Sequence, residues 1–172
     1  MRLTVLAVAI AALYAAGSAS AATLTPSDTF QVTASVANSC VVTAANDIAF
    51  GAYDPAGTNN TAALDGAGSV EVRCTRGSNA AITLDQGLHA ASGSVCATPL
   101  RQMSDGATDR LRYDLYSDSS RATAWGCDAT NDVEKSFTSL APVTFTTYGR
   151  IPAGQDVLAG SYTDTVTVAV TF

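Results

Sequence analysis

The chain has 172 residues, of which 47% are hydrophobic and 14% are charged, and its formal net charge is −6. This length is enough for one domain with a sizeable core. The acidic balance argues against nucleic-acid binding, which depends on neutralising phosphates with Lys and Arg, and against a polybasic membrane contact.

The first 21 residues are typical of a secretory signal peptide. Met1 and Arg2 precede an apolar run over Leu3–Ala16, and Ala19-Ser20-Ala21 supplies the small residues of a cleavage site. The run is too short for a spanning helix, and no later segment approaches 18 uninterrupted apolar residues. We therefore expect residues 1–21 to be removed and a soluble chain that begins near Ala22 to be exported.

The segment that follows, residues 22–36, contains an alternating apolar row. Its apolar members are Phe30, Val32, Ala34 and Val36, and polar residues stand between them. Alternation with a period of two indicates a β-strand with one apolar face. Two interpretations are open: an ordinary first strand that leads into Cys40, or a strand that pairs outside its own domain.

Four cysteines lie in the exported region: Cys40, Cys74, Cys96 and Cys127. Export to an oxidising compartment favours disulfides, and three connectivities are possible. The sequential pairing closes loops of about 30 to 35 residues, each stabilising by about 3 to 4 kcal/mol in the chain-entropy model. Zinc is disfavoured because no two cysteines have CxxC spacing and the single histidine, His89, has no partner at ligand spacing.

The sequence pattern of residues 37–172 predicts one domain of short strands separated by turns, with no amphipathic helix. Strands are predicted around Val41, Ile48–Phe50, Ser69–Cys74, Ile82–Leu84, Arg110–Leu115, Val143–Phe145 and Tyr162–Phe172. The stretch from Gly51 to Gly68 is rich in turn residues, and Gly87–Asp109 is predicted to be a long loop that contains Cys96. This pattern predicts an all-β fold, an antiparallel β-sandwich.

The last predicted strand has the strongest alternation in the sequence. Val166, Val168, Val170 and Phe172 share one face, and threonine or alanine stands between them. If this strand lies at the edge of a sheet, its outer N–H and C=O groups need a partner. We therefore expect an acceptor edge here, and what completes it bears on the function.

Catalysis is not indicated. His89 is the only histidine and has no acidic neighbour in sequence, so we interpret it as a surface residue. Two of the carboxylates Asp105, Asp109, Asp114 and Asp118 could form the acid/base pair of a glycosidase, but acidic residues in turns are more often solvated caps. The sequence predicts no enzyme, no cofactor, no metal and no small-molecule substrate.

Several short motifs together resemble the spore coat protein U domain family, which includes subunits of archaic chaperone–usher pili. These motifs cover most of the exported chain: Cys40 with Cys74, Phe50–Pro55, Arg101–Met103, Leu111–Asp118, Trp125–Gly126, Tyr148–Pro152 and Gly160–Asp164. The resemblance implies an incomplete immunoglobulin-like sandwich that lacks its seventh strand. It also implies a disulfide between Cys40 and Cys74, whereas the family does not require the second pair.

The resemblance further implies assembly by donor-strand exchange. A periplasmic chaperone first supplies the missing strand, and in the fibre the N-terminal segment of the next subunit replaces it. The expected donor is residues 22–36, which inserts Phe30, Val32, Ala34 and Val36, and residues 37–172 are the acceptor domain. The implied partners are other copies or related subunits, the chaperone and an outer-membrane usher, and the implied role is surface attachment and biofilm formation. The alternative is a free-standing coat or adhesive protein with a self-completed sandwich.

Overall fold

The computed structural model describes residues 24–172, so the predicted signal peptide and the first two residues of the predicted donor segment lie outside the described part. The chain divides into two units, residues 1–35 and residues 36–172. In the first unit, residues 24–35 contain no helix or strand. Phe30 and Val32 are 88% and 85% exposed. An apolar row is therefore open to solvent before the first strand.

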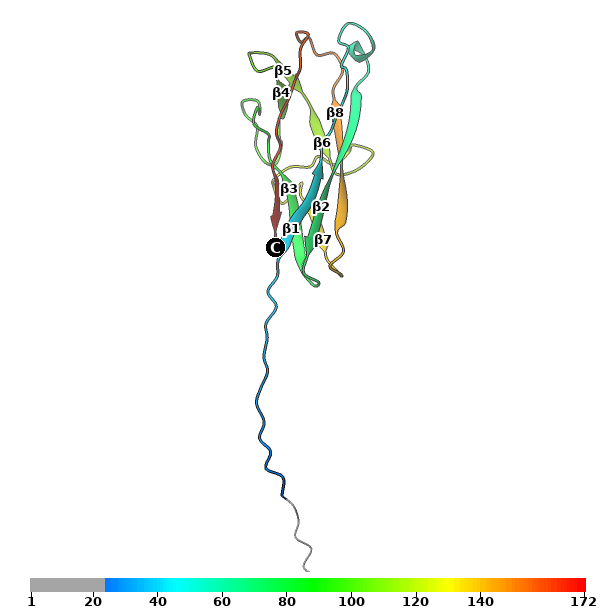
Figure 1. Cartoon of the computed structure of the whole chain (residues 1–172). Helices are drawn as coiled ribbons and strands as arrows, with labels where there is room; N and C mark the ends of the chain where they lie inside the picture. The colour runs from blue at the N-terminus through cyan, green and yellow to red at the C-terminus, as the bar shows by residue number, and fades with distance from the viewer. Residues whose placement is uncertain (1–23) are drawn as a thin grey trace, which may run out of the picture. The chain divides into compact units, whose positions relative to one another are not determined.

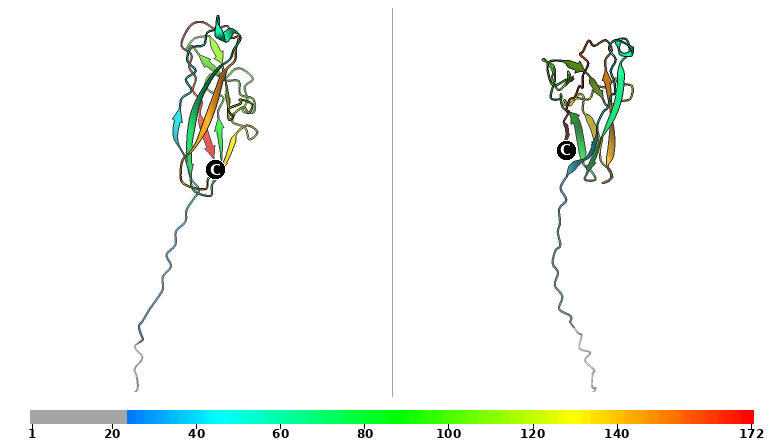
Figure 2. Two further views of the ribbon diagram at one scale, coloured as in Figure 1. Left: turned by 90° about the vertical axis from the view of Figure 1, so that its right-hand side faces the viewer. Right: turned by 45° about the horizontal axis from the view of Figure 1, so that its top comes forward.

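The second unit, residues 36–172, is called the body and consists of antiparallel strands with one 3₁₀ turn at Thr58–Asn60. The first sheet has the order β1-β2-β8-β6, with bounds Cys40–Asn46, Leu64–Cys74, Val143–Ile151 and Asp114–Tyr116. The second has the order β7-β3-β9, with bounds Val133–Ser136, Asn79–Leu84 and Val168–Thr171. A separate pair joins β4, Gln102–Ser104, to β5, Arg110–Arg112. Figures 1 and 2 show the long strands β2 and β8 side by side.

The core lies between the two larger sheets. Its fully buried side chains come from both sheets and from the loops beside them: Val72, Ile82, Trp125, Phe137 and Ile151. The Trp125 indole N–H donates to the Ile82 carbonyl at 2.9 Å, which satisfies the polar end of a buried ring. The predicted all-β antiparallel class is confirmed. No helix in residues 24–172 is long and apolar enough to cross a bilayer.

Several element boundaries differ from those predicted. β2 begins at Leu64, inside the stretch predicted as turns, because the glycines there pack against neighbouring side chains instead of turning the chain. The predicted strand at Ile48–Phe50 is absent, and both side chains pack against the core from a loop. The alternating row around Tyr113 divides into β5 and β6, which pair with different strands. Two short strands, β4 and β7, were not predicted.

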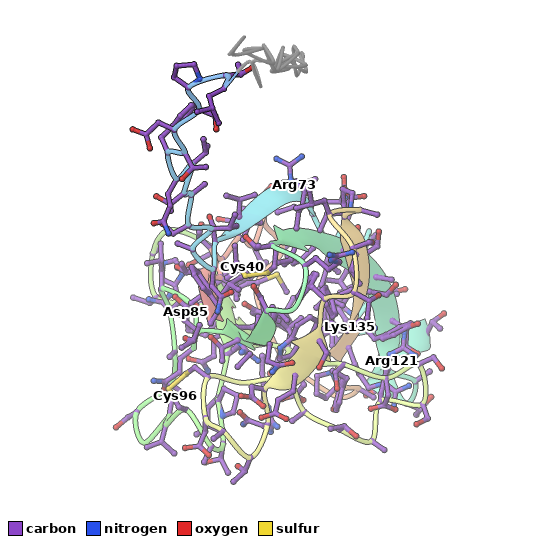
Figure 3. All side chains as sticks on the ribbon, turned by 90° about the horizontal axis from the view of Figure 1, so that it is seen from below. Cys40, Arg73, Asp85, Cys96, Arg121 and Lys135 are labelled. Atoms are coloured by element: carbon purple, nitrogen blue, oxygen red, sulfur yellow. A yellow bond between two sulfur atoms is a disulfide. The ribbon has the colours of Figure 1, made fainter. Side chains whose placement is uncertain are left out.

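Two disulfides connect parts of the body that are far apart in sequence (Figure 3). They follow the sequential pairing, Cys40 with Cys74 and Cys96 with Cys127. The first joins paired residues of β1 and β2. The second ties the long loop after β3 to the segment before β7. The second bond therefore restrains a long loop that lies outside the strand ladders.

Candidate functional site at the open edge

Each large sheet has two edge strands, β1 and β6 in the first and β7 and β9 in the second, and the candidate site lies at β1 and β9. Among the strands of residues 24–172, β1 pairs only with β2, and β9 pairs only with β3. Cys40 pairs with Cys74 and Thr171 pairs with Ala81, so both strands reach the turn that joins β2 to β3. They lie close together there (Figure 1). An open edge therefore runs between the two sheets.

The chain leading into β9 is hydrogen-bonded on one side only. The carbonyls of Thr163, Thr165 and Thr167 accept backbone N–H bonds of 2.8 to 3.2 Å from Ser104, Leu88 and Asp85. Peptide groups alternate sides along a strand, so those of the intervening residues face the open edge. Within the described residues, the peptide groups of Asp164 and Val166 have no backbone partner. They are available to a further strand.

Two adjoining cavities of about 660 and 500 Å³ follow this edge, and their linings share Ile48, Phe50, Met103 and Tyr162. We call them together the edge groove. One wall is formed from residues 45–55, at the end of β1 and beyond it. The other is formed from residues 157–168, before and at the start of β9. The floor is formed by core side chains: Val70, Leu84, Leu111, Tyr113 and Leu115. A groove of this composition suits an extended chain with alternate apolar side chains.

The four residues predicted as the acceptor edge occupy different positions. Val166 and Val168 line the edge groove. Val170 packs against the core and pairs with Ile82. Phe172 is 55% exposed and follows the end of β9. The groove therefore lies mainly alongside the residues before β9, and a donor contact at any of the four positions stays a prediction.

The opposite wall was not predicted, and it depends on Ile48 and Phe50. Gly66 in β2 and Gly149 in β8 face each other in the ladder beneath these two side chains. A Cβ atom at Gly149 would lie 2.6 Å from Phe50 Cζ, and one at Gly66 would lie 2.9 Å from Phe50 Cδ1. Such distances are shorter than any stable contact, so both glycines are needed where the ring lies. The sequence signal was the alternation of Ile48 and Phe50 just before Gly51.

A buried carboxylate stands behind the open edge. The Asp164 side chain is only 2% exposed, and it accepts the Tyr113 hydroxyl at 2.7 Å and the Leu88 N–H at 3.0 Å. Its Oδ1 also lies 3.0 Å from His89 Nδ1. Burial, together with the hydrogen bond to Asp164, raises the pKa of Tyr113 far above its usual range. Tyr113 therefore remains a hydrogen-bond donor at physiological pH.

Asp85 and Arg101 secure the same region. Asp85 Oδ1 accepts the N–H groups of Gly87 and Thr167, both at 2.9 Å. Burial opposes ionisation of Asp85, but the Thr167 and Gly87 N–H groups outweigh it and hold the pKa of Asp85 below its usual value. The Arg101 guanidinium is buried and donates to the carbonyls of Leu84, Asp85 and Trp125 at 2.6 to 2.9 Å. Figure 3 labels Asp85 and Cys96 in this part of the body.

His89 has an acidic partner that the sequence did not indicate, because Asp164 lies 75 residues further along the chain. The His89 side chain is 34% exposed, which agrees with its interpretation as a surface residue. In residues 24–172, no serine, threonine or cysteine side chain hydrogen-bonds to its ring. The arrangement in the described part therefore contains an imidazole–carboxylate contact without an adjacent nucleophile.

The other carboxylates considered for catalysis stabilise loops. Asp118 accepts the N–H groups of Ala122 and Thr123, and hydrogen bonds led by that from Ser120 hold the pKa of Asp118 well below its usual range. Asp109 accepts the Leu158 N–H at 2.6 Å and the Tyr162 hydroxyl at 2.9 Å. No group of three or more His, Cys, Asp or Glu residues in the described part is arranged to hold a metal ion.

An antiparallel sandwich with an apolar groove along an unpaired edge defines a class of proteins that can accept a strand. The chain belongs to the Spore Coat Protein U domain family, which it matches over residues 27–169. It is 42% identical over 171 residues to Protein U of Myxococcus xanthus, and the alignment covers 95% of this chain and 93% of that protein.

The fold is also similar to a solved structure, the CsuC–CsuE chaperone–tip adhesion subunit pre-assembly complex from archaic chaperone-usher Csu pili of Acinetobacter baumannii. The TM-score is 0.54 with 23% sequence identity, and the match covers 80% of this chain and 40% of that chain. At this identity the similarity concerns the fold. It confirms the predicted class, an incomplete immunoglobulin-like sandwich of the pilin type.

Proposed function

We propose that the chain is an exported structural subunit of an archaic chaperone–usher pilus, which polymerises by donor-strand exchange and catalyses no reaction. Residues 22–36 of one copy fill the edge groove of the next copy. The observation that carries this proposal is the match between the exposed apolar row of residues 30–36 and the apolar edge groove. One wall of that groove includes a segment that is hydrogen-bonded on one side only. Family membership agrees with it.

The donor row has the spacing and the exposure that the groove requires. Alternate side chains of an extended strand lie about 6.6 Å apart, so the four from Phe30 to Val36 distribute contacts over about 20 Å. Phe30, Val32 and Val36 are 84% to 88% exposed. Burying each one contributes about 1.5 to 3 kcal/mol before the cost of ordering the segment. The donor backbone also satisfies the free peptide groups of Asp164 and Val166.

The positions of the body's two ends support a filament instead of a closed ring. The body begins at the end of the sandwich that holds Cys40 and Thr171. The edge groove extends toward the opposite end, where Leu64 pairs with Ile151. A donor antiparallel to β9 leaves the groove at that opposite end, so successive copies stack with the same polarity. Head-to-tail contacts of this kind generate an open fibre when the rotation between copies does not close.

An open edge needs protection between export and assembly. An exposed strand edge beside an apolar groove is a site for non-specific pairing. A periplasmic chaperone that lends a strand removes this hazard, and an outer-membrane usher then exchanges that strand for the next subunit. The similar solved complex contains a chaperone with a pilus subunit. The fibre's role in this proposal is surface attachment and biofilm formation.

A second candidate function is a free-standing coat or cell-surface protein whose sandwich completes itself. The observation that favours it is the family's description, together with the similarity to Protein U over nearly the whole chain. In this case the apolar row of residues 30–36 enters the groove of its own chain. The two candidates differ in oligomeric state, since only strand exchange between copies produces fibres.

The test uses the chain beginning at Ala22, with Val32→Glu as the variant and Thr33→Glu as its matched control. The substitution at Val32 places a charge on the inserted face, whereas the one at Thr33 places the same charge on the outward face of the same segment. We expect Val32→Glu to abolish fibres in electron micrographs and sedimentation, and Thr33→Glu to form them. Equal assembly by both variants contradicts donor-strand exchange. A wild-type chain that stays a stable monomer supports the self-completed sandwich.

A further inference from the structure

The open edge is longer than the ladder that supports it. β9 pairs with β3 only from Val168 to Thr171, and β3 ends at Leu84, opposite Val168. The wall of the edge groove nevertheless continues back through Val166 and Asp164 to Tyr162. Residues 162–167 therefore form the groove wall without a regular neighbouring strand. A single antiparallel bridge from Thr163 to Ser104, side chains and turn amides take the place of that strand.

Asp85 holds the part of this stretch next to β9 through two hydrogen bonds to one residue, Thr167. Its backbone N–H donates to the Thr167 carbonyl at 3.0 Å, and its carboxylate accepts the Thr167 N–H at 2.9 Å. Thr167 thus accepts one hydrogen bond and donates another, as it would to a neighbouring strand of a ladder. The same carboxylate accepts the Gly87 N–H, which fixes the turn that follows β3.

Asp164 holds the second part from within. Its carboxylate turns inward to Tyr113, Leu88 and His89, which holds in place the segment whose peptide groups at Asp164 and Val166 have no backbone partner among the described residues. Gly87, at φ +77°, allows the turn to lie directly on this carboxylate, because a Cβ there would collide with Asp164 Oδ2. A buried Arg101 and the Cys96–Cys127 disulfide anchor the loop that carries His89. The Asp164 carboxylate and the loop that contacts it are therefore both held in place.

We propose that Asp85, His89, Tyr113 and Asp164 form a polar clasp that positions the free peptide groups of the open edge for an incoming donor strand. The clasp is a set of positioning residues, since its hydrogen bonds are made within the subunit. By holding residues 163–167 extended in the empty subunit, it lowers the ordering cost of strand addition. The inference rests on the proposed strand exchange, and its partner is the donor segment, residues 22–36, of a second copy.

The first measurement does not depend on a donor. In the full exported chain carrying Val32→Glu, amide hydrogen exchange is followed at Leu88 and Thr167, with Asp118→Asn as the matched control. Asp118 also accepts backbone N–H bonds, but it does not line the groove. We expect Asp164→Asn and Asp85→Asn to speed exchange at these amides at least tenfold, and Asp118→Asn to leave them unchanged. Unchanged exchange in both clasp variants overturns the proposal.

The second measurement uses a fluorescent peptide of residues 24–38 as the donor, with the same chains as acceptors. We expect Asp164→Asn and Tyr113→Phe to weaken binding at least tenfold, mainly through slower association, while their thermal midpoints fall no further than that of Asp118→Asn. Binding within twofold of the intact clasp overturns the positioning role. Failure of the intact clasp to bind the peptide, with the exchange results as expected, instead contradicts strand exchange itself.

Discussion

The central β2–β8 pair and the open edge between β1 and β9 are built from similar alternating sequences, yet they differ in how their backbones are satisfied. β2 and β8 pair over nine consecutive residues, from Leu64 with Ile151 to Val72 with Val143. The edge pairs on one side only, and an apolar groove lies beside it. The difference shows that the same strand chemistry gives stability where a partner is present and a binding site where one is missing.

The two regions meet at Gly149, and replacing this residue is the change with the largest expected effect. Gly149→Ala places a methyl group 2.6 Å from Phe50 Cζ, so the ring must move out of its position over β8. We expect a loss of about 1 to 3 kcal/mol in unfolding free energy, measured with urea, and weaker binding of the donor peptide. Gly160→Ala is the control for the unfolding measurement, because the nearest atom to a Cβ at that position is 3.9 Å away. Equal losses in both variants contradict this account of the groove wall.

We expect acid to weaken the open edge before the central pair. The pKa of Asp85 is lower in the folded chain than the ordinary 3.8, so its stabilising effect is present at higher pH and is lost as pH falls below 3.8 through the folded value. We expect hydrogen exchange at Thr167 to accelerate in this range before exchange in β2 does. Asp85→Asn removes the dependence. An acid transition at the edge that persists in Asp85→Asn has another cause.

The smallest effect is expected at the solvent-facing charges of the central pair. Asp65 accepts two hydrogen bonds from Arg150, at 2.7 and 2.9 Å, and lies 3.3 Å from Arg121. Because these groups are partly exposed, Asp65→Asn should cost about 0 to 1 kcal/mol in urea unfolding and should leave donor binding unchanged. A loss above about 2 kcal/mol, or altered binding, shows that the ion pairs of β2 and β8 couple to the open edge.

Much of the fold was predictable because a strand with one buried face has apolar and polar residues in alternation. The strands ending at Cys74, Leu84 and Thr171 all carry this pattern, and so does the exposed row from Phe30 to Val36. Short strands such as β4 and β7 were not predictable, since three or four residues with a single apolar member carry no period. The clasp was also hidden, because His89 and Asp164 are separated by 75 residues and meet only through the turn after β3.

By itself, the sequence determined the all-β class, the apolar alternation of the donor row and of the last strand, and the cysteines available for disulfides. These features depend on local pattern and composition. The tertiary structure alone decided where the open edge lies and what forms its walls. Ile48 and Phe50 became a wall because Gly66 and Gly149, far away in sequence, leave room for them. Asp164 became a buried anchor because two separate segments, one with Leu88 and His89 and one with Tyr113, converge on its carboxylate. Long-range packing sets such contacts, and no local pattern encodes them.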